Sequence, residues 1–215
     1  MKEELKKIIS GEVEDNESTL IKYSKDASIF KVKPKLVIFP RDSADIEKVV
    51  KFASENKKND PNLSITARAG GSCMAGGPLN ESIILDTTKY LVGIKSWAND
   101  SAVVMLGTMY KDFEIESLAR DLLLPCFTAS KNLNAIGGMI GNNSAGEKTL
   151  KYGQMDRYVK KLKMVFSDGV EREIRPLSVD ELEQKKKQDD FEGKIYREVD
   201  ELVESNKELI EIDRP

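Results

Sequence analysis

Two stretches of this sequence have backbone bare enough to approach a ligand closely. The longer one, GGMIGNNSAGEKTLKYG, runs from Gly137 to Gly153 and holds five glycines and two adjacent asparagines. Because glycine lacks a Cβ, such a segment can bring its N–H groups very near a bound molecule. Asparagine and serine side chains add hydrogen-bond donors that carry no charge. This combination suits a diphosphate or a polar, uncharged ring system, although a series of capped turns would also use these residues.

The same stretch can be compared with the phosphate-binding P-loop, which reads G-x-x-x-x-G-K-[ST]. Gly141 and Gly146 have the required spacing, but Glu147 is inserted before Lys148 and Thr149. One extra residue turns a helical side chain by about 100°. The lysine would therefore miss the phosphates, and a carboxylate would face them. The dinucleotide fingerprint G-x-G-x-x-G is also absent, so the sequence argues against both kinds of site.

The shorter stretch, RAGGSCMAGG, runs from Arg68 to Gly77 directly after a predicted strand. Paired glycines can adopt positive φ, so that successive N–H groups point to one side and form an anion-binding nest. Ser72 adds a hydroxyl donor, and Arg68 can bind an anion or pair with a carboxylate. Taken alone, this stretch fits a plain flexible loop equally well. Two such loops in separate α/β units fit one long ligand, and a dinucleotide has the right length.

A small α/β unit is predicted to hold the first loop. Its expected elements are a strand at 35–40, a helix at 43–58, a strand at 62–66 and a strand at 82–85. The helix is indicated by Ser43 as its N-cap and by apolar residues that share one face. Residues 3–10 are expected to form a short helix, and residues 11–28 are polar with no predicted element.

A second unit is predicted around the longer loop. Its expected elements are β-like segments at 91–94 and 102–106, a helix at 109–122, and a hairpin of 162–166 and 170–174. The helix carries an apolar stripe formed by Ile115, Leu118, Ala119 and Leu122. Ser178 and Glu181 resemble a capping box, and residues 193–209 are predicted to be helical through Ile195, Val199 and Leu202. The lysine run at 185–187 is interpreted as a solvated helix end rather than a basic patch.

Composition limits the classes of function. The 215 residues carry 34 basic and 37 acidic side chains, and a net charge of -3 argues against nucleic-acid binding. No run approaches the ~18 apolar residues of a membrane-spanning helix, and no signal peptide opens the chain, so a cytoplasmic protein is expected. There is no histidine, which excludes a histidine-based triad. Cys73 and Cys126 lack metal-ligand spacing, so no metal site is predicted.

Five motifs occur in order along the chain. They are Tyr23-Ser-Lys-Asp-Ala-Ser28, Val37-Ile-Phe-Pro-Arg41, Arg68-Ala-Gly-Gly-Ser72, Gly137-Gly-Met-Ile-Gly-Asn-Asn-Ser-Ala-Gly146 and Lys151-Tyr-Gly153. With these motifs, roughly residues 20–215 resemble the FAD-binding domain of FAD-linked oxidases, the vanillyl-alcohol-oxidase/PCMH flavoprotein superfamily. The resemblance implies an α+β fold, a PCMH-type FAD-binding domain made of two α/β subdomains with the cofactor between them.

The resemblance also divides the chain. Residues 1–28 would form an N-terminal helix and lead-in, 29–95 the first FAD-binding subdomain, and 96–215 the second subdomain with C-terminal helices. The substrate cap domain would be absent from this chain. Iron–sulfur cysteines, which a subgroup of the superfamily carries in a C-terminal part, would also lie beyond it.

The resemblance implies a set of FAD-binding residues, with Arg68 to Met74 wrapping the pyrophosphate. The set is Pro40, Arg68, Ala69, Gly70, Gly71, Ser72, Cys73, Met74, Ser130, Gly137, Gly138, Gly141, Asn142, Ala145, Val159 and Val165. Val159 and Val165 would lie beside the adenine and ribose, although ordinary core positions explain them as well.

Non-covalent binding of FAD is expected. Some members attach the flavin through a histidine in the first loop, where this chain has Ser72. Others use a cysteine shortly before the second glycine pair, but Cys126 lies too far upstream. Relatives carry an Asp-Pro-Ser-[Ser/Thr]-like stretch where this chain has Phe127-Thr-Ala-Ser130. The proline of that stretch is therefore missing here.

Within the superfamily, the motifs look like those of D-lactate dehydrogenase, glycolate oxidase and D-2-hydroxyglutarate dehydrogenase, in the subgroup with a C-terminal iron–sulfur part. This resemblance implies oxidation of a small D-2-hydroxy acid by hydride transfer to flavin N5, with an electron acceptor that the sequence does not identify. No catalytic residue is assigned within the chain, and the chain alone is expected to be inactive. Two alternatives stay open: a non-catalytic FAD-binding subunit, and a flavin reductase of the UDP-acetylenolpyruvylglucosamine reductase kind.

Overall fold

The computed structural model describes residues 1–213; Arg214 and Pro215, the end of the predicted second subdomain, lie outside the described residues. The chain divides into two compact units. The first comprises Met1–Val159 and Lys163–Arg172, and the second comprises Lys160–Leu162 and Glu173–Pro215. Both glycine-rich loops belong to the first unit. The subdomain boundaries after residues 28 and 95 stay predictions.

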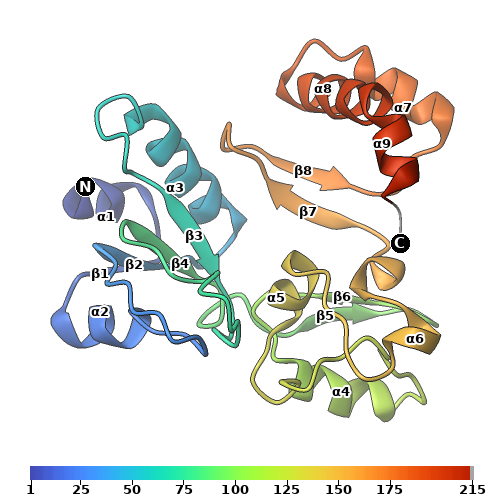
Figure 1. The fold of residues 1–215 in the computed structure, drawn as a ribbon. Coiled ribbons are helices and arrows are strands. Elements are labelled where there is room, and N and C mark those ends of the chain that lie inside the picture. The colour runs from blue at the N-terminus through green and yellow to red at the C-terminus, as the bar shows by residue number, and fades with distance from the viewer. Residues whose placement is uncertain (214–215) are drawn as a thin grey trace. The chain divides into compact units, whose positions relative to one another are not determined.

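A four-stranded sheet with the strand order β1-β2-β4-β3 forms the N-terminal part of the first unit (Figure 1). Its strands are β1 (Glu12–Glu14), β2 (Leu36–Phe39), β3 (Ile65–Arg68) and β4 (Ile83–Asp86). Its helices are α1 (Lys2–Ile8), α2 (Glu17–Tyr23) and α3 (Ser43–Asn56). β1 runs antiparallel to β2, whereas β2 and β3 both run parallel to β4.

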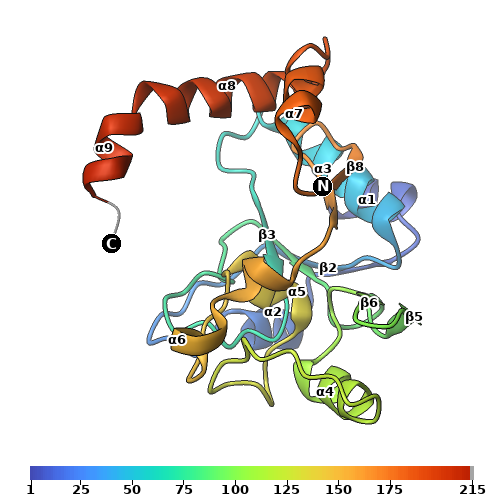
Figure 2. The same ribbon diagram turned by 90° about the vertical axis from the view of Figure 1, so that its right-hand side faces the viewer.

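Both faces of this sheet are covered, which explains the uninterrupted apolar run of β2. Side chains alternate between the two faces of a strand. Ile38 belongs to an apolar cluster with Val49 of α3, and α1 contributes to the same cluster. Its neighbour Val37 belongs to a second cluster with Leu20 of α2. Helices α1 and α3 therefore cover one face and α2 covers the other (Figure 2).

The predicted strands and the helix at 43–58 of this part are confirmed, each to within a few residues. The predicted N-cap of the helix was wrong, because Asp42 rather than Ser43 caps it, with its side chain accepting from the N–H of Asp45. The interpretation of residues 11–28 as polar sequence without an element was wrong, because this segment forms β1 and α2. Asn16 caps α2, since its side chain accepts a hydrogen bond from the N–H of Thr19 at 2.9 Å.

Asp45 ties α3 to the ends of α1 and β2. Its side chain is 1% exposed, and it accepts hydrogen bonds from the N–H groups of Ser10 at 2.8 Å and Arg41 at 3.0 Å. Burial by itself would raise the pKa of this carboxyl, but the backbone hydrogen bonds outweigh burial and hold the pKa below its ordinary value of 3.8. The carboxylate is therefore the stabilising form.

We expect Asp45→Asn to lower the free energy of unfolding at pH 7 by about 2 kcal/mol, because hydrogen bonds to a charged acceptor are lost. A group whose pKa is depressed on folding stabilises the fold above its unfolded pKa and loses this effect as the pH falls through the folded pKa. Wild-type stability should thus fall more steeply below pH 4 than that of the variant. Urea unfolding at several pH values measures both. Asp42→Asn, at the N-cap of α3, is the control that should change little, since asparagine caps equally well; equal losses in the two variants would contradict the assignment.

The remainder of the first unit packs around a second core. Its elements are β5 (Ile94–Trp97), β6 (Ala102–Val104), α4 (Tyr110–Leu118), α5 (Ile136–Gly141), α6 (Thr149–Tyr152) and the 3-10 helix η1 (Met155–Tyr158). β5 and β6 form an antiparallel hairpin. The buried residues of this core are Tyr110, Phe113, Cys126, Phe127, Ile136, Met139 and Met155.

The apolar stripe predicted for α4 was wrong. Ile115 is 69% exposed and Leu118 is 53% exposed. The helix instead buries Tyr110 and Phe113, and the Phe113 ring stacks on Trp97 at a centroid distance of 5.6 Å. Aromatic side chains bury more apolar area than the aliphatic stripe offers, so they decide which face of the helix turns inward. The helix also ends at Leu118 rather than at residue 122.

The predicted hairpin at 162–174 is confirmed as β7 (Leu162–Val165) and β8 (Glu171–Ile174). Gly169 in its turn has φ +77, a value that favours glycine. The turn lies against α3, because the N–H of Glu171 donates to Glu47 Oε1 at 2.7 Å.

The second unit contains α7 (Val179–Lys186), α8 (Phe191–Ser205) and α9 (Lys207–Ile212). The capping box of Ser178 and Glu181 is confirmed. Lys185 and Lys186, two of the three adjacent lysines, form ion pairs with Glu192 and Asp200 at 2.6 Å each. The predicted helix at 193–209 is divided at Asn206. Two residues of its expected apolar face, Val199 and Leu202, are 53% and 64% exposed within the described residues.

Within residues 1–213, no helix combines the length and hydrophobicity needed to cross a bilayer.

Candidate functional site

The first glycine-rich loop follows β3 and has the backbone expected of an anion-binding nest. Gly71 has φ +67 and Gly76 has φ +78. Within residues 1–213, the N–H groups from Gly70 to Met74 donate to no other group of the chain. Consecutive N–H groups without intrachain acceptors, next to a residue with positive φ, are suited to an anion.

Arg68, at the start of this loop, is held by the segment Tyr23–Ala27, which we call the strap. Its guanidinium donates to the carbonyl oxygens of Lys25 at 2.7 Å and Tyr23 at 3.3 Å. It also lies over the Tyr23 ring, 5.1 Å from the ring centroid. In return, the N–H of Ala27 donates to the carbonyl oxygen of Gly71 at 3.2 Å. The strap and the loop are therefore joined at both ends.

The strap is anchored in turn to the sheet. The Tyr23 hydroxyl donates to Asp86 Oδ2 at 3.0 Å, and Asp86 Oδ1 accepts from the N–H of Thr88 at 2.7 Å. Burial, followed by the nearby charge of Asp86, raises the pKa of the Tyr23 hydroxyl far above its ordinary value of 10.0. Tyr23 is thus a neutral hydrogen-bond donor at physiological pH and not an acid–base group.

The second glycine-rich segment forms α5 and the turns after it. The N–H of Gly137 donates to the Leu106 carbonyl oxygen at 2.7 Å. A Cβ on Gly146 would lie 1.8 Å from the carbonyl oxygen of Phe127, so only glycine fits there. The Lys148 ammonium lies over the Phe127 ring at 5.2 Å, an arrangement unlike that of a P-loop lysine.

The two glycine-rich segments contact each other, although they are far apart in the sequence. A Cβ on Gly70 would lie 2.1 Å from the carbonyl oxygen of Leu133, just before α5. A Cβ on Gly138, within α5, would lie 3.3 Å from the Ala69 side chain. The structure therefore brings together predicted residues of both loops.

Asn134, which sequence reasoning missed, lies at this junction. Its side chain is 6% exposed, and its Nδ2 donates to Thr128 Oγ1 at 2.8 Å. Its Oδ1 is buried and has no hydrogen-bond partner in the described part of the chain. Thr128 also hydrogen-bonds the Ser130 hydroxyl at 2.8 Å. The only sequence signal was a polar residue directly before the apolar start of α5.

The remaining predicted residues are distributed as follows. Ser72 and Cys73 are half-buried in the first loop, and Met74 is exposed at its tip. Gly141, Asn142 and Ala145 are exposed at the end of α5 and after it. Pro40 is buried after β2, Val159 packs against the second core, and Val165 is half-buried in β7. The contacts that join the two loops include none of these last three residues.

The two cysteines differ in access. Cys126 is fully buried with its Sγ 3.3 Å from Met155 Sδ, and burial raises the pKa of its thiol. Cys73 is half-buried, and its Sγ accepts from the N–H of Ala75 at 3.4 Å. Among residues 1–213, no group of three or more histidine, cysteine or acidic side chains is placed to hold a metal ion.

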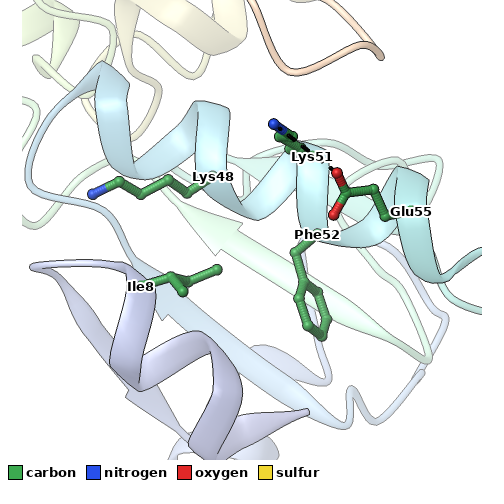
Figure 3. Close-up of a pocket in the computed structure, with 5 residues that line it drawn as sticks. All are labelled: Ile8, Lys48, Lys51, Phe52 and Glu55. Atoms are coloured by element: carbon green, nitrogen blue, oxygen red, sulfur yellow. Dashed lines mark ion pairs between the residues drawn. The ribbon is translucent and has the colours of Figure 1, made fainter.

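An open groove of about 440 Å³ lies elsewhere in the first unit, between α1 and α3 (Figure 3). Its lining residues are Ile8, Lys48, Lys51, Phe52 and Glu55. None of them was predicted to bind a cofactor.

Comparison with known proteins gives a consistent set of relatives. The chain is 27% identical over 210 residues to D-2-hydroxyglutarate dehydrogenase of Escherichia coli, covering 94% of this chain and 20% of that protein. It is 30% identical over 136 residues to D-lactate dehydrogenase of Archaeoglobus fulgidus, covering 62% of this chain and 29% of the relative. It is 29% identical over 172 residues to a glycolate oxidase subunit of Bacillus subtilis, covering 79% and 36%. The chain thus spans about a fifth to a third of the length of these relatives.

Solved structures share the fold. That of 6-hydroxy-D-nicotine oxidase from Arthrobacter nicotinovorans aligns with a TM-score of 0.67 and 23% identity, over 78% of this chain and 36% of that chain. That of alkyldihydroxyacetonephosphate synthase aligns with a TM-score of 0.65 and 18% identity, over 76% and 32%. The predicted fold class is confirmed as an α+β FAD-binding domain of the PCMH type.

The family model described as "FAD binding domain" matches residues 34–175, a range that contains both glycine-rich loops, the strand before the first loop and the strap's anchor Asp86. With this match over more than half of its length, the chain belongs to the FAD binding domain family.

Proposed function

We propose that this chain binds FAD non-covalently across its two glycine-rich loops and is the FAD-binding portion of a dehydrogenase that oxidises a D-2-hydroxy acid. The observation that carries the proposal is the contact between the two segments: Gly70 lies against the backbone of Leu133, just before α5, and Gly138 of α5 lies beside the Ala69 side chain. This contact makes one continuous surface from two segments that each offer bare backbone. The relatives named above support the class of substrate, since their names refer to 2-hydroxyglutarate, lactate and glycolate.

The residues at this surface fit a dinucleotide. The N–H groups from Gly70 to Met74, which have no acceptor within residues 1–213, can donate hydrogen bonds to the oxygens of a diphosphate. Asn134 Oδ1, a buried acceptor without a partner in the described residues, is the kind of group that normally finds a donor. A flavin nucleotide carries such donors in its hydroxyl and ring N–H groups.

When bound, FAD supplies the acceptor for a hydride from the substrate Cα, at flavin N5. This chain's own contribution is to bind and orient the cofactor: the first loop holds the diphosphate, and the Thr128–Asn134 pair offers polar contacts beside it. We assign no general base to the chain. The substrate pocket and the electron acceptor, and any iron–sulfur cluster, would belong to the remainder of a protein as long as the relatives.

The functional test uses a full-length protein, as long as the relatives, that contains this chain. The protein is loaded with FAD, and reduction of its flavin is followed in the absence of oxygen. A D-2-hydroxy acid should bleach the flavin absorption, whereas its L-enantiomer should not. Bleaching by NADPH instead would favour a flavin reductase. A flavin that neither compound reduces would favour a non-catalytic FAD-binding subunit.

Cys73 gives a test of the loop assignment that needs no substitution. We expect iodoacetamide to label Cys73 at least about tenfold faster than Cys126, since access and thiolate formation both control reactivity. Saturating FAD should slow the labelling of Cys73, because Cys73 lies among the N–H groups proposed to hold the diphosphate. Mass spectrometry of the two cysteine peptides measures both rates, with Cys126 as the internal control. An unchanged Cys73 rate in a sample that has bound FAD would place this loop outside the site.

A further inference from the structure

We infer that Arg68 is a positioning residue, which acts on the cofactor site by tying the strap Tyr23–Ala27 to the first glycine-rich loop. This inference rests on the proposed function, because the loop it positions is the proposed diphosphate site. It differs from the sequence-based expectation, in which Arg68 itself binds the pyrophosphate.

The guanidinium of Arg68 already makes hydrogen bonds and a ring contact within the chain. One arm of the guanidinium donates to the Lys25 carbonyl oxygen at 2.7 Å and the other to the Tyr23 carbonyl oxygen at 3.3 Å. The group also stacks on the Tyr23 ring at 5.1 Å. A planar fork with fixed donors matches such a pair of acceptors in a way that an ammonium cannot. Turning Arg68 toward a phosphate would remove the donors from both carbonyl groups, and unmade hydrogen bonds cost free energy.

The Arg68 guanidinium also contacts Gly71, the residue at which the loop backbone turns. A Cβ on Gly71 would lie 2.6 Å from Arg68 Nη2, so the guanidinium lies directly against the residue with φ +67. Gly71 is also held by the hydrogen bond that the N–H of Ala27 donates to its carbonyl oxygen. Thr87 fixes the base of the loop, because its N–H donates to the Arg68 carbonyl oxygen at 3.0 Å. A loop held in its binding conformation before the ligand arrives pays less ordering entropy on binding.

Arg68→Lys and Arg68→Met separate the two roles. If Arg68 positions the loop, both variants lose the two-carbonyl bridge, and both should weaken FAD binding by about tenfold. The ratio of variant to wild-type Kd should be the same at 50 mM and 500 mM NaCl, the two conditions of the assay. If Arg68 contacts the diphosphate, lysine should keep most of the affinity, and the loss in Arg68→Met should shrink as salt screens the charge. That second pattern would overturn the inference.

Arg120→Met is the matched control. Arg120 also stacks on an aromatic ring, 4.5 Å from the Trp97 centroid, and donates to a backbone carbonyl oxygen, that of Glu116, at 2.7 Å. It should change the Tm without changing the Kd for FAD. Arg68 variants that lower the Tm but leave the Kd unchanged would show a merely structural role and would also overturn the inference.

A second readout does not depend on FAD. When Arg68→Met loosens the loop, Cys73 should react with iodoacetamide about fivefold faster than in the wild type, as expected for a more frequently opened segment. Arg120→Met should leave that rate unchanged. An unchanged labelling rate of Cys73 in Arg68→Met would contradict the claim that Arg68 holds the strap to the first loop. Absence of FAD binding by the wild type would instead count against the proposed function alone.

Discussion

Gly71→Asp is expected to weaken FAD binding at least about 100-fold, because the added carboxylate would lie within the loop proposed to hold the diphosphate, and two unit charges 4 Å apart near a protein surface repel by about 4 kcal/mol. The residue has φ +67 and adjoins N–H groups that have no acceptor within the described chain. Aspartate tolerates this backbone region better than most residues. Its Cβ would lie 2.6 Å from Arg68 Nη2, so aspartate and asparagine alike must displace the guanidinium, and the charge should account for the difference between these two variants. Absorption or fluorescence titration with FAD measures the affinity.

Two controls isolate the charge. Gly71→Asn introduces a side chain of the same shape and similar backbone tolerance without the charge, and should retain much more of the affinity. Gly169→Asp places the same charge at another glycine of positive φ, +77, in the β7–β8 turn, and should leave FAD binding unchanged. Equal affinities for Gly71→Asp and Gly71→Asn would rule out this loop as the diphosphate site.

Gly70→Ala is expected to cost about 2 kcal/mol of folding free energy, in the range found for overpacked sites, and also to weaken FAD binding. A Cβ at this position would lie 2.1 Å from the Leu133 carbonyl oxygen. The Leu133 carbonyl is backbone rather than the end of a flexible side chain, so the first loop and the segment before α5 must separate. Thermal unfolding and FAD titration measure the two effects.

The stability control for this substitution is Gly141→Ala. Gly141 lies at the end of α5 with nothing within 4 Å of an added Cβ, and alanine favours a helix over glycine. Its Tm should equal or exceed that of the wild type. If Gly70→Ala were as stable as Gly141→Ala, the close contact between the loops would not exist in solution.

The local sequence pattern was sufficient to predict an element wherever the residues of that segment determine its structure. The apolar run of β2 and the capping box at Ser178 and Glu181 each specify an element by neighbours in the sequence. The positive φ of Gly71 follows likewise from a paired glycine after a strand. Within the candidate site, the first loop was therefore predictable as a loop, whereas the second glycine-rich segment forms helix α5 at its start and α6 near its end, which its glycines did not indicate.

Long-range packing was the part that could not be predicted. The exposed Ile115 and the buried Phe113 of α4 both fit a helical period, and only stacking of Phe113 on Trp97 decides between them. The strap lies 45 residues before Arg68 at its Tyr23 contact, and nothing local indicates that pairing. Asn134 is one polar residue among several before α5, and only its burial singles it out.

The central claim is that backbone N–H groups and polar side chains of both loops form one FAD site. Equilibrium titration of the purified chain with FAD, followed by desalting and an absorption spectrum, tests it most directly. The claim predicts a yellow 1:1 complex whose visible bands differ from those of free FAD. A colourless protein after desalting, with the spectrum of free FAD unchanged throughout the titration, would contradict it.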